Sequence, residues 1–299
     1  ADLGAMTNEF DIDRVYLTAK RTLSEDFSIR VTTDVGRLKT QTIEIGDEAV
    51  TVDTKTRVFL KYAYLEWKDA LPNMKLRLGM SGTAWTGQSD RFWGHRWVQK
   101  SFADKHKILS TSDLGVQALG TLSDGMVSWQ AGIINGTGYG KPENNASKTA
   151  QARVTVNALN ASKGSLPVSA FVSYDPTDFN ANGEPEGDTS FTYAVGTGYK
   201  VDAGHVWAEY IGRSKGETTS SGYTVNAVGH LGGLGQVVLW YDSWDANTST
   251  EDDSENSALA GLAHNYGNKV SMGVFYEHTL PQGNAAPSQS VFVRMQAGF

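Results

Sequence analysis

The sequence of 299 residues predicts an all-β fold, a transmembrane antiparallel up-and-down β-barrel, and three observations lead to this prediction. Apolar and polar residues alternate along most of the chain, whereas apolar residues at helical spacing are hard to find. Many alternating segments are about as long as the ~9–11 residues that a tilted membrane-spanning strand needs. Short turns and long polar loops follow these segments in turn, as at the two rims of a membrane barrel.

Composition excludes several other classes. The hydrophobic share is 39%, the mean hydropathy is −0.36, and no apolar run reaches the ~18 residues of a membrane helix. The 26 basic and 33 acidic residues give a net charge of −7, which argues against a nucleic-acid partner. The absence of cysteine excludes disulfide scaffolds and thiolate metal sites, and it fits an exported protein. We expect one domain over residues 1–299.

Alternation predicts fifteen strands. In residues 27–35, for example, Phe27, Ile29 and Val31 share one face, and Ser28 and Arg30 lie on the other. Successive side chains of a strand point to opposite faces, so each segment has one apolar and one polar side. The segments in chain order are 10–22, 27–37, 56–67, 74–81, 111–122, 126–135, 150–159, 166–174, 190–201, 205–213, 222–231, 235–244, 257–266, 270–279 and 289–299.

The connections separate into two kinds. Short turns rich in Gly, Asn and Asp, which favour hairpins, follow at every second junction. They are 24–26, 69–73, 123–125, 160–165, 202–204, 232–234 and 267–268. The intervening connections are long and polar, namely 38–55, 82–110, 136–149, 175–189, 214–221, 245–256 and 280–288. An outer-membrane barrel sorts its connections in this way, and a soluble sandwich does not.

Alternation alone does not decide which face points outward. Two features favour an apolar face toward lipid: charged and glycine residues on the polar faces, and aromatic residues near the strand ends, as in interfacial girdles. These aromatics are Tyr62, Tyr64, Trp67, Trp129, Tyr174, Tyr199, Tyr210, Tyr241, Trp244 and Tyr276. A third feature is the last segment, which alternates up to the terminal Phe299. We therefore predict a bacterial outer-membrane location.

Two parts of the chain resemble known outer-membrane proteins. The last strand closing on Phe299 resembles the C-terminal insertion signal of bacterial outer-membrane barrels, which implies the barrel assembly machinery as a partner. Residues 10–20 and 23–35, and then 61–67 and 75–79, resemble the first two hairpin regions of porins of the phosphate-selective group. This resemblance implies a porin that forms a homotrimer among outer-membrane lipid and lipopolysaccharide.

The predicted number of strands, fifteen, is odd. Single-chain bacterial barrels have an even number of strands. If Phe299 lies at the periplasmic rim, segment 10–22 runs in the same direction as the last strand, so one strand should precede it. Residues 1–9 are too short and too unpatterned to supply a regular strand. We expect a 16-stranded barrel whose first strand is lost or irregular.

Residues 82–110 form the longest connection and become the third extracellular loop in this assignment. The porin resemblance implies that this loop folds into the lumen and narrows it. Its aromatic residues, such as Trp85 and Trp93, would hold it to the wall, and its candidate constriction residues are Asp90, Arg91, Arg96 and Lys100. The alternative is a loop that only caps the top of the barrel.

Further charged residues fall on the polar, lumen-facing side of the strands. They are Arg14, Arg30, Lys61, Lys75, Arg77, Asp113, Arg153, Glu209, Asp242, Glu277 and Arg294. Cations dominate the first segments and acids the later ones, so the two walls would create a transverse field that selects ions by charge. We predict a modest anion preference. The alternative is a nearly unselective pore.

Motifs for catalysis or metal binding are sparse. The chain has no His-Glu-x-x-His and no Gly-x-Ser-x-Gly, so we expect no enzyme. Residues 178–183 match the first half of an EF-hand loop through Asp178, Asn180 and Asn182, although Thr189 stands where the bidentate glutamate is expected. The 175–189 loop is thus a candidate Ca²⁺ site, with a solvated acidic loop as the alternative. No other cofactor is expected.

The sequence therefore predicts a porin, a water-filled channel for passive diffusion of small hydrophilic solutes and ions. The alternative is a non-conducting outer-membrane barrel whose extracellular loops bind a surface or cell-envelope partner. A soluble all-β protein is a third reading, disfavoured by the sorted loop lengths and by the lack of a long internal repeat. Single-channel conductance separates the first two, and a requirement for detergent separates both from the third.

Overall fold

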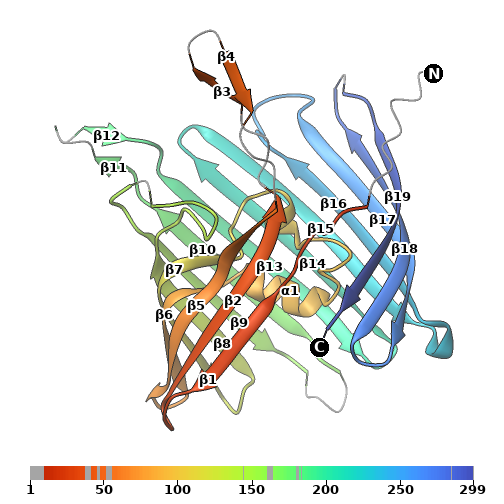
Figure 1. Ribbon diagram of the computed structural model, residues 1–299, viewed down its shortest axis with the longest axis horizontal. Helices are drawn as coiled ribbons and strands as arrows, with labels where there is room; N and C mark the ends of the chain where they lie inside the picture. Colours follow the sequence, from red (N-terminus) through yellow and green to blue (C-terminus); the bar gives the residue numbers. More distant parts are fainter. Residues whose placement is uncertain are drawn as a thin grey trace.

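The chain is almost entirely a single β-sheet. A computed structural model describes residues 10–37, 42–45, 48–51, 56–143, 145–159, 164–179, 182, 184–283 and 285–298. In these ranges one antiparallel sheet contains 15 strands in the order β1-β2-β5-β6-β7-β8-β9-β10-β13-β14-β15-β16-β17-β18-β19. Neighbouring strands of this sheet are also consecutive in the chain, apart from the two small hairpins, which is the predicted up-and-down arrangement (Figure 1).

The strands of the sheet run from 6 residues in β1 to 16 in β5. Their bounds are β1 Leu17–Thr22, β2 Phe27–Arg37, β5 Thr56–Leu71, β6 Met74–Gly82, β7 Ser112–Leu122, β8 Val127–Ile134, β9 Thr149–Asn157, β10 Pro167–Asp175, β13 Ser190–Val201, β14 Gly204–Lys215, β15 Thr218–His230, β16 Gln236–Asp245, β17 Ser254–Tyr266, β18 Val270–Pro281 and β19 Ser288–Ala297. Two small hairpins lie in long connections: β3 Thr42–Ile45 with β4 Glu48–Thr51, and β11 Asp178–Phe179 with β12 Pro185–Glu186.

The sheet curls around helix α1, Thr86–Trp93, and β1 and β19 are its two edges (Figure 1). Within the described residues, β1 pairs only with β2 and β19 only with β18, so the sheet is not closed. Residues 1–9, the part of the chain in which an irregular first strand could lie, are outside the described residues, so the predicted sixteenth strand stays a prediction. No helix in the part of the chain that the structure describes is both long and apolar enough to cross a membrane.

The two faces of the sheet are inverted relative to a soluble barrel. In β10 the inward Ser169 and Ser173 are buried, whereas Val168, Val172 and Tyr174 on the other face are 51%, 47% and 48% exposed. The same pattern leaves Val195 of β13 and Val274 of β18 more than half exposed on the outside. The outward apolar face predicted from alternation is thus present, and its natural surrounding is lipid.

The predicted aromatic girdle is only partly outward. Tyr193 and Tyr210 pack on the outer face with ring centroids 6.2 Å apart, and so do Tyr223 and Tyr241 at 6.0 Å. Trp244, predicted as a girdle residue, is instead buried on the inner face, where its ring stacks on His106. Tyr62 and Tyr64 also lie on the inner face, opposite Thr32 and Arg30 of β2. Their register places them on the same side as buried Thr32, so the assignment of these three aromatics to the girdle was wrong.

Two predicted segment boundaries need correction. The first strand begins at Leu17 rather than at residue 10, and in residues 10–16 the Val15 N–H instead donates to Asp34 Oδ1 at 3.3 Å. The predicted long connection 214–221 is a tight turn, because β14 and β15 extend until only Gly216 and Glu217 join them. Gly216 has a φ of +56°, in the left-handed region that glycine adopts at little cost and that tight turns use.

Candidate functional site

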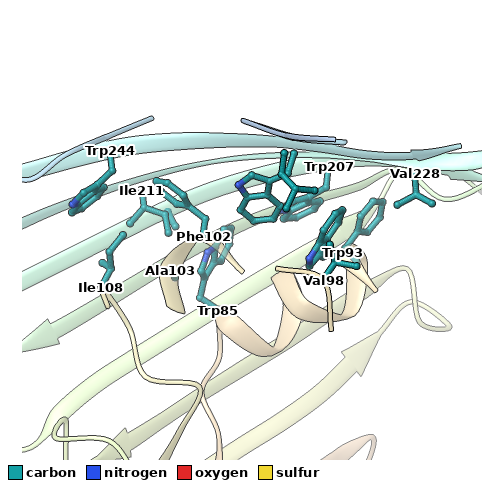
Figure 2. Packing of buried hydrophobic residues seen from close by; sticks show 14 of the residues in the cluster. Trp85, Trp93, Val98, Phe102, Ala103, Ile108, Trp207, Ile211, Val228 and Trp244 are labelled. Atoms are coloured by element: carbon teal, nitrogen blue, oxygen red, sulfur yellow. The ribbon is translucent and has the colours of Figure 1, made fainter. Parts of the chain in front are cut away.

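The segment joining β6 to β7, residues 83–111, crosses the concave face of the sheet (Figure 1). It carries α1 and a short helix α2, Phe102–Lys105. Trp85, Trp93 and Phe102 of this segment are 0% exposed. They belong to the main buried apolar cluster of the molecule, which joins the segment to the inner face of β10–β18 (Figure 2). The wall contributes Phe171, Ala194, Trp207, Ile211, Val228, Val238, Trp240, Trp244, Leu259, Ala263 and Phe275.

We call this inner face of β10–β18 the covered wall. Two glycines of β13 lie against aromatic rings there. A Cβ atom at Gly198 would lie 2.7 Å from the Phe92 ring of the segment, and one at Gly196 would lie 2.5 Å from the Trp207 ring of the wall and 3.1 Å from the Trp85 ring of the segment. Real Cβ atoms essentially never approach a heavy atom within 3.0 Å, so a larger residue at either position would displace these rings.

Asp242 of β16 fastens α2 to the covered wall. Lys105 Nζ donates to Asp242 Oδ2 at 2.7 Å, and His106 Nε2 lies 2.8 Å from Asp242 Oδ1. Trp240 Nε1 also donates to this carboxylate. Asp242 is 0% exposed, so it lies beneath the segment. The sequence predicted it as a lumen-lining charge, and its position is on the predicted face but out of contact with solvent.

Glu209 and Glu277 have similar positions. Glu209 of β14 is 3% exposed and accepts hydrogen bonds from Ser89 Oγ at 3.2 Å and Trp207 Nε1 at 3.1 Å. Glu277 of β18 accepts from Gln99 Nε2 at 2.8 Å. Three acids predicted to face the pore therefore contact the segment or the residues beneath it, and their carboxyl groups help to hold the segment in place.

The side of the segment that faces away from the covered wall is polar. Arg96 donates to Asp90 Oδ1 at 2.9 Å and to Asp104 Oδ2 at 2.7 Å, which fixes the chain between α1 and α2. Burial acts to lower the pKa of the Arg96 guanidinium, but the carboxylates of Asp90 and Asp104 outweigh it and raise that pKa. Arg96 is thus charged at every ordinary pH. Arg91 and Lys100 are exposed on the same segment.

A polar cavity of about 110 Å³ separates this side of the segment from β2 and β5. We call the inner face of β2–β9 the open wall. The cavity brings together four residues of the predicted set, Arg14, Lys61, Arg96 and Lys100. The other residues that line the cavity are Asp13, Tyr16, Asp34, Val35, Gly36, Phe59, Asp104 and Tyr139.

Cations of the open wall lie over aromatic rings. Lys61 Nζ is 3.5 Å from the centroid of the Tyr139 ring, and it donates to Thr111 Oγ1. The guanidinium of Arg30 lies 4.4 Å from the Tyr62 ring centroid. Such contacts stabilise a cation without neutralising it. Burial raises the pKa of the Tyr139 hydroxyl, so the ring under Lys61 carries no charge at neutral pH.

The other predicted lining residues are distributed along the same inner face. Arg77 pairs with Glu66 at 2.8 Å, and Lys75, half exposed, lies 3.9 Å from the same carboxylate. Arg294 of β19 lies 3.9 Å from Asp13. Arg153 of β9 is 6% exposed and donates only to Thr155 Oγ1.

Asp113 of β7 differs from the remaining lining residues because backbone amides surround it. Its carboxylate accepts from Leu114 N, Gly136 N and Gly138 N at 2.7, 2.9 and 3.0 Å. It therefore holds the β8–β9 loop, and on the inner face it is buried rather than in contact with solvent.

The balance of charge on the open wall and the polar side of the segment, taken together, is positive. Within the described ranges, none of Arg30, Lys61, Arg91, Lys100 and Arg153 forms an ion pair with a carboxylate within 4.0 Å. Of the acids in the same region, Asp90 and Asp104 pair with Arg96 and Glu66 pairs with Arg77, whereas Asp34 and Asp113 accept only from backbone N–H groups. More cations than acids therefore lack an ion-pair partner there.

Sequence reasoning missed several residues of the cavity. They are Tyr16, Asp34, Phe59 and Tyr139, none of which is among the residues predicted from the sequence. The signal available for Asp34 and Phe59 is their position in the alternation, which puts both on the inner face. Nothing in the sequence indicates that the loop after β8 returns Tyr139 to Lys61.

Two predicted sites fall wholly or partly outside the described residues. Phe299 lies outside them, and so does Asn180 of the candidate calcium loop. Asp178 Oδ2 accepts from Ala146 N at 2.8 Å, and Asn182 is exposed. Within the described residues no three His, Cys, Asp or Glu side chains are grouped closely enough to hold a metal ion. The Ca²⁺ site stays a prediction.

Comparison with known proteins identifies the fold. The chain matches no protein-family model and no curated protein. Among solved structures it is similar to an anion-selective porin from Comamonas acidovorans, with a TM-score of 0.64 and 12% identity over 96% of this chain and 89% of that one. It is similar to OprB of Pseudomonas putida, with a TM-score of 0.69 and 10% identity over 96% and 87%.

A third similar structure is OmpT, an outer-membrane protein of Vibrio cholerae, in its trimer form. It has a TM-score of 0.54 and 11% identity over 94% of this chain and 88% of that one. At these identities the likeness establishes the fold and leaves solutes and selectivity open. The chain has the fold of bacterial outer-membrane porins, and its outward apolar face suits that membrane.

Proposed function

We propose that the chain forms a water-filled channel for passive diffusion of small hydrophilic solutes and ions across the outer membrane, with a modest preference for anions. The observation that carries this proposal is the asymmetry of the lumen. The segment packs its apolar side on the covered wall, and its polar side faces an open wall with uncompensated cations. A hydrated passage is expected where polar and charged groups face one another and no apolar packing fills the space.

In this proposal, residues 82–110 narrow the channel. The segment occupies one side of the lumen, so solutes pass between Arg96 and Lys100 on the segment and Arg14 and Arg30 on the wall side. Arg96 is neutralised by its two aspartates, whereas Arg30, Lys61 and Lys100 are not paired with carboxylates. The passage therefore offers anions a favourable potential and cations an unfavourable one. Phosphate is one anion that such a passage would admit.

The partners of the proposed porin follow from its outer surface and its fold. The apolar outward faces would contact outer-membrane lipid and lipopolysaccharide, and a homotrimer is proposed because a similar structure adopts a trimer form. Delivery by the barrel assembly machinery through Phe299 remains part of the proposal. The proposal includes no enzymatic step.

Planar-bilayer recording tests the function directly. We expect stepwise conductance from purified protein, and in a KCl gradient a reversal potential of the sign for chloride over potassium permeability. The double variant Arg30→Gln/Lys100→Gln should shift that potential toward zero, whereas Lys269→Gln, in the exposed turn after β17, should not. Clear cation selectivity of the wild type would contradict the anion preference. A protein that inserts but never conducts would favour the loop-binding alternative.

A further inference from the structure

Two cations lie directly opposite each other where β1 and β2 pair. Lys20 of β1 is the register partner of Arg30 of β2, and both share the inner face with buried Thr32, two positions along. Like charges directly opposite each other in a sheet are destabilising. Within the described ranges, no carboxylate lies within 4.0 Å of either cation to offset this repulsion. The two charges are therefore available to a solute in the lumen.

The Arg30 guanidinium is held in one orientation. Its Nε donates to Thr32 Oγ1 at 3.1 Å, and that hydroxyl lies 2.9 Å from Thr18 Oγ1 of β1. The guanidinium also lies 4.4 Å from the centroid of the Tyr62 ring. Among the described residues, none accepts a hydrogen bond from Nη1 or Nη2 of Arg30. These two planar N–H groups match the two oxygens of a carboxylate.

A β-bulge in β5 accompanies this position. The register of β2 with β5 shifts between Thr32 and Thr33, and Lys61 has no partner residue in β2. Lys61 and Tyr62 are consecutive, yet both point inward, Lys61 to the Tyr139 ring and Tyr62 to the Arg30 guanidinium. Bulges re-aim side chains and are over-represented next to functional sites. One bulge therefore supplies a residue to the polar cavity and a ring to Arg30.

The neighbours of Arg30 in β5 are aromatic. Tyr64 is its register partner, and Tyr62 lies two positions along the strand. Arg77 lies 5.0 Å from the centroid of the Tyr64 ring, but Glu66 already pairs with it at 2.8 Å. A carboxylate bound at Arg30 would therefore have tyrosine rings beside the rest of its molecule, where an aromatic body packs favourably. Phosphate, with acceptor oxygens on all sides, would meet those rings where it needs donors.

We propose that Lys20 and Arg30 bind the carboxylate of small aromatic acids that enter the channel. The rings of Tyr62 and Tyr64 then lie beside the ring of the solute. The proposal rests on the proposed function, because the solute reaches this site through the lumen, and it adds a solute class. The site is separate from the polar cavity, since Arg30 is four residues from cavity-lining Asp34, about 13 Å along β2.

Titration of the purified, detergent-solubilised protein with benzoate tests the site without requiring conduction. Saturation-transfer NMR should show bound benzoate, and weaker binding of cyclohexanecarboxylate, which has the same charge and no aromatic ring. We expect Arg30→Gln and Lys20→Gln each to weaken benzoate binding at least about 10-fold, because each removes a charge-assisted contact. Arg21→Gln is the matched control, because Arg21 follows Lys20 in β1, pairs with Ile29 and lies on the other face.

Planar-bilayer recording connects the site to permeation. Benzoate should reduce the chloride current in a saturable manner, and phosphate at the same concentration should reduce it less. Arg30→Lys keeps the charge but loses the planar pair of donors. It should therefore keep the reversal potential in a KCl gradient and lose most of the block by benzoate. Wild-type conductance of this variant would show that it is folded.

Absence of benzoate binding, or equal benzoate affinity of wild type, Arg30→Gln and Lys20→Gln, would overturn the proposal. So would equal affinity for benzoate and cyclohexanecarboxylate, or equal block by benzoate and phosphate. The chloride preference of the channel would stand in each of these cases. A protein that binds benzoate through Arg30 but never conducts would instead contradict the proposed channel and support the site.

Discussion

The covered wall and the open wall belong to one sheet and follow one rule of alternation, yet their inner faces differ in chemistry. On the covered wall, Trp207, Ile211 and Phe275 are 0–1% exposed because the segment packs on them. On the open wall, Arg30 and Lys61 lie over tyrosine rings, Glu66 pairs with Arg77, and Lys61 lines the polar cavity. The difference shows that a lumen need not be polar all round. Where a segment folds inward, an apolar core forms between the segment and the part of the wall that it covers.

Asp242→Ala is expected to have the largest effect on the packing of the segment against the covered wall. Removal of this buried carboxylate leaves Lys105 and His106 without their partner, at a cost of roughly 3–5 kcal/mol. We expect the segment to leave the covered wall, so that single-channel conductance rises and limited proteolysis cuts within residues 83–111. Asp245→Ala, at the end of the same strand, is the control. Unchanged conductance and protease resistance in Asp242→Ala would show that the segment does not depend on this carboxylate.

Gly198→Val should weaken the same packing by a smaller amount. The new Cβ would meet the Phe92 ring, and overpacking of this kind costs about 1–3 kcal/mol. We expect noisier channel currents and a lower thermal transition, measured by circular dichroism. Gly229→Val on β15, where a Cβ would meet no atom within 4 Å, provides the comparison. If both variants behave alike, the close approach of Phe92 to β13 is not a constraint.

Arg96→Gln tests how the charges on the polar side of the segment affect ion selectivity. The substitution removes one cation and leaves the carboxylates of Asp90 and Asp104 without their partner in the passage. We expect the reversal potential in a KCl gradient to move toward cation selectivity by more than it does in Lys100→Gln, which removes an unpaired charge alone. Equal shifts would mean that Asp90 and Asp104 do not reach the permeating ions.

Lys75→Gln should have the smallest effect. Lys75 is half exposed and lies 3.9 Å from Glu66, which Arg77 already pairs at 2.8 Å. An exposed pair of this kind contributes about 0–1 kcal/mol. We expect a thermal transition and conductance within error of the wild type. A large loss of stability would indicate that Lys75 has a role the geometry does not account for.

Alternation predicted the inner position of each strand charge, because a side chain has only two faces to choose between. It could not predict what those charges contact. Glu209 and Asp242 have the sequence surroundings expected of lumen residues, but the segment that buries them lies more than a hundred positions away in the chain. Residues 237–241, which are apolar on both faces, are the local signal that something covers the inside of β16.

Turns and ends were harder to predict for a different reason. Residues 10–16 alternate as a strand would, but Val15 N–H hydrogen-bonds to the Asp34 carboxylate. Residues 214–221 are polar enough to look like a loop, yet cross-strand pairing from Ser214 to Thr219 continues them as strands up to Gly216 and Glu217. In both cases a hydrogen-bonding partner elsewhere in the chain decided the outcome, and the composition of the segment does not reveal that partner.

Accessibility of introduced cysteines tests the central claim most directly, because the natural chain has no cysteine. In membrane-inserted protein, a charged, water-soluble thiol reagent should label Arg30→Cys on the open wall and reduce the channel current. The same reagent should leave Ile211→Cys on the covered wall unlabelled and the current unchanged. Labelling of Ile211→Cys as fast as Arg30→Cys would contradict an inward segment packed on one wall beside a hydrated passage along the other.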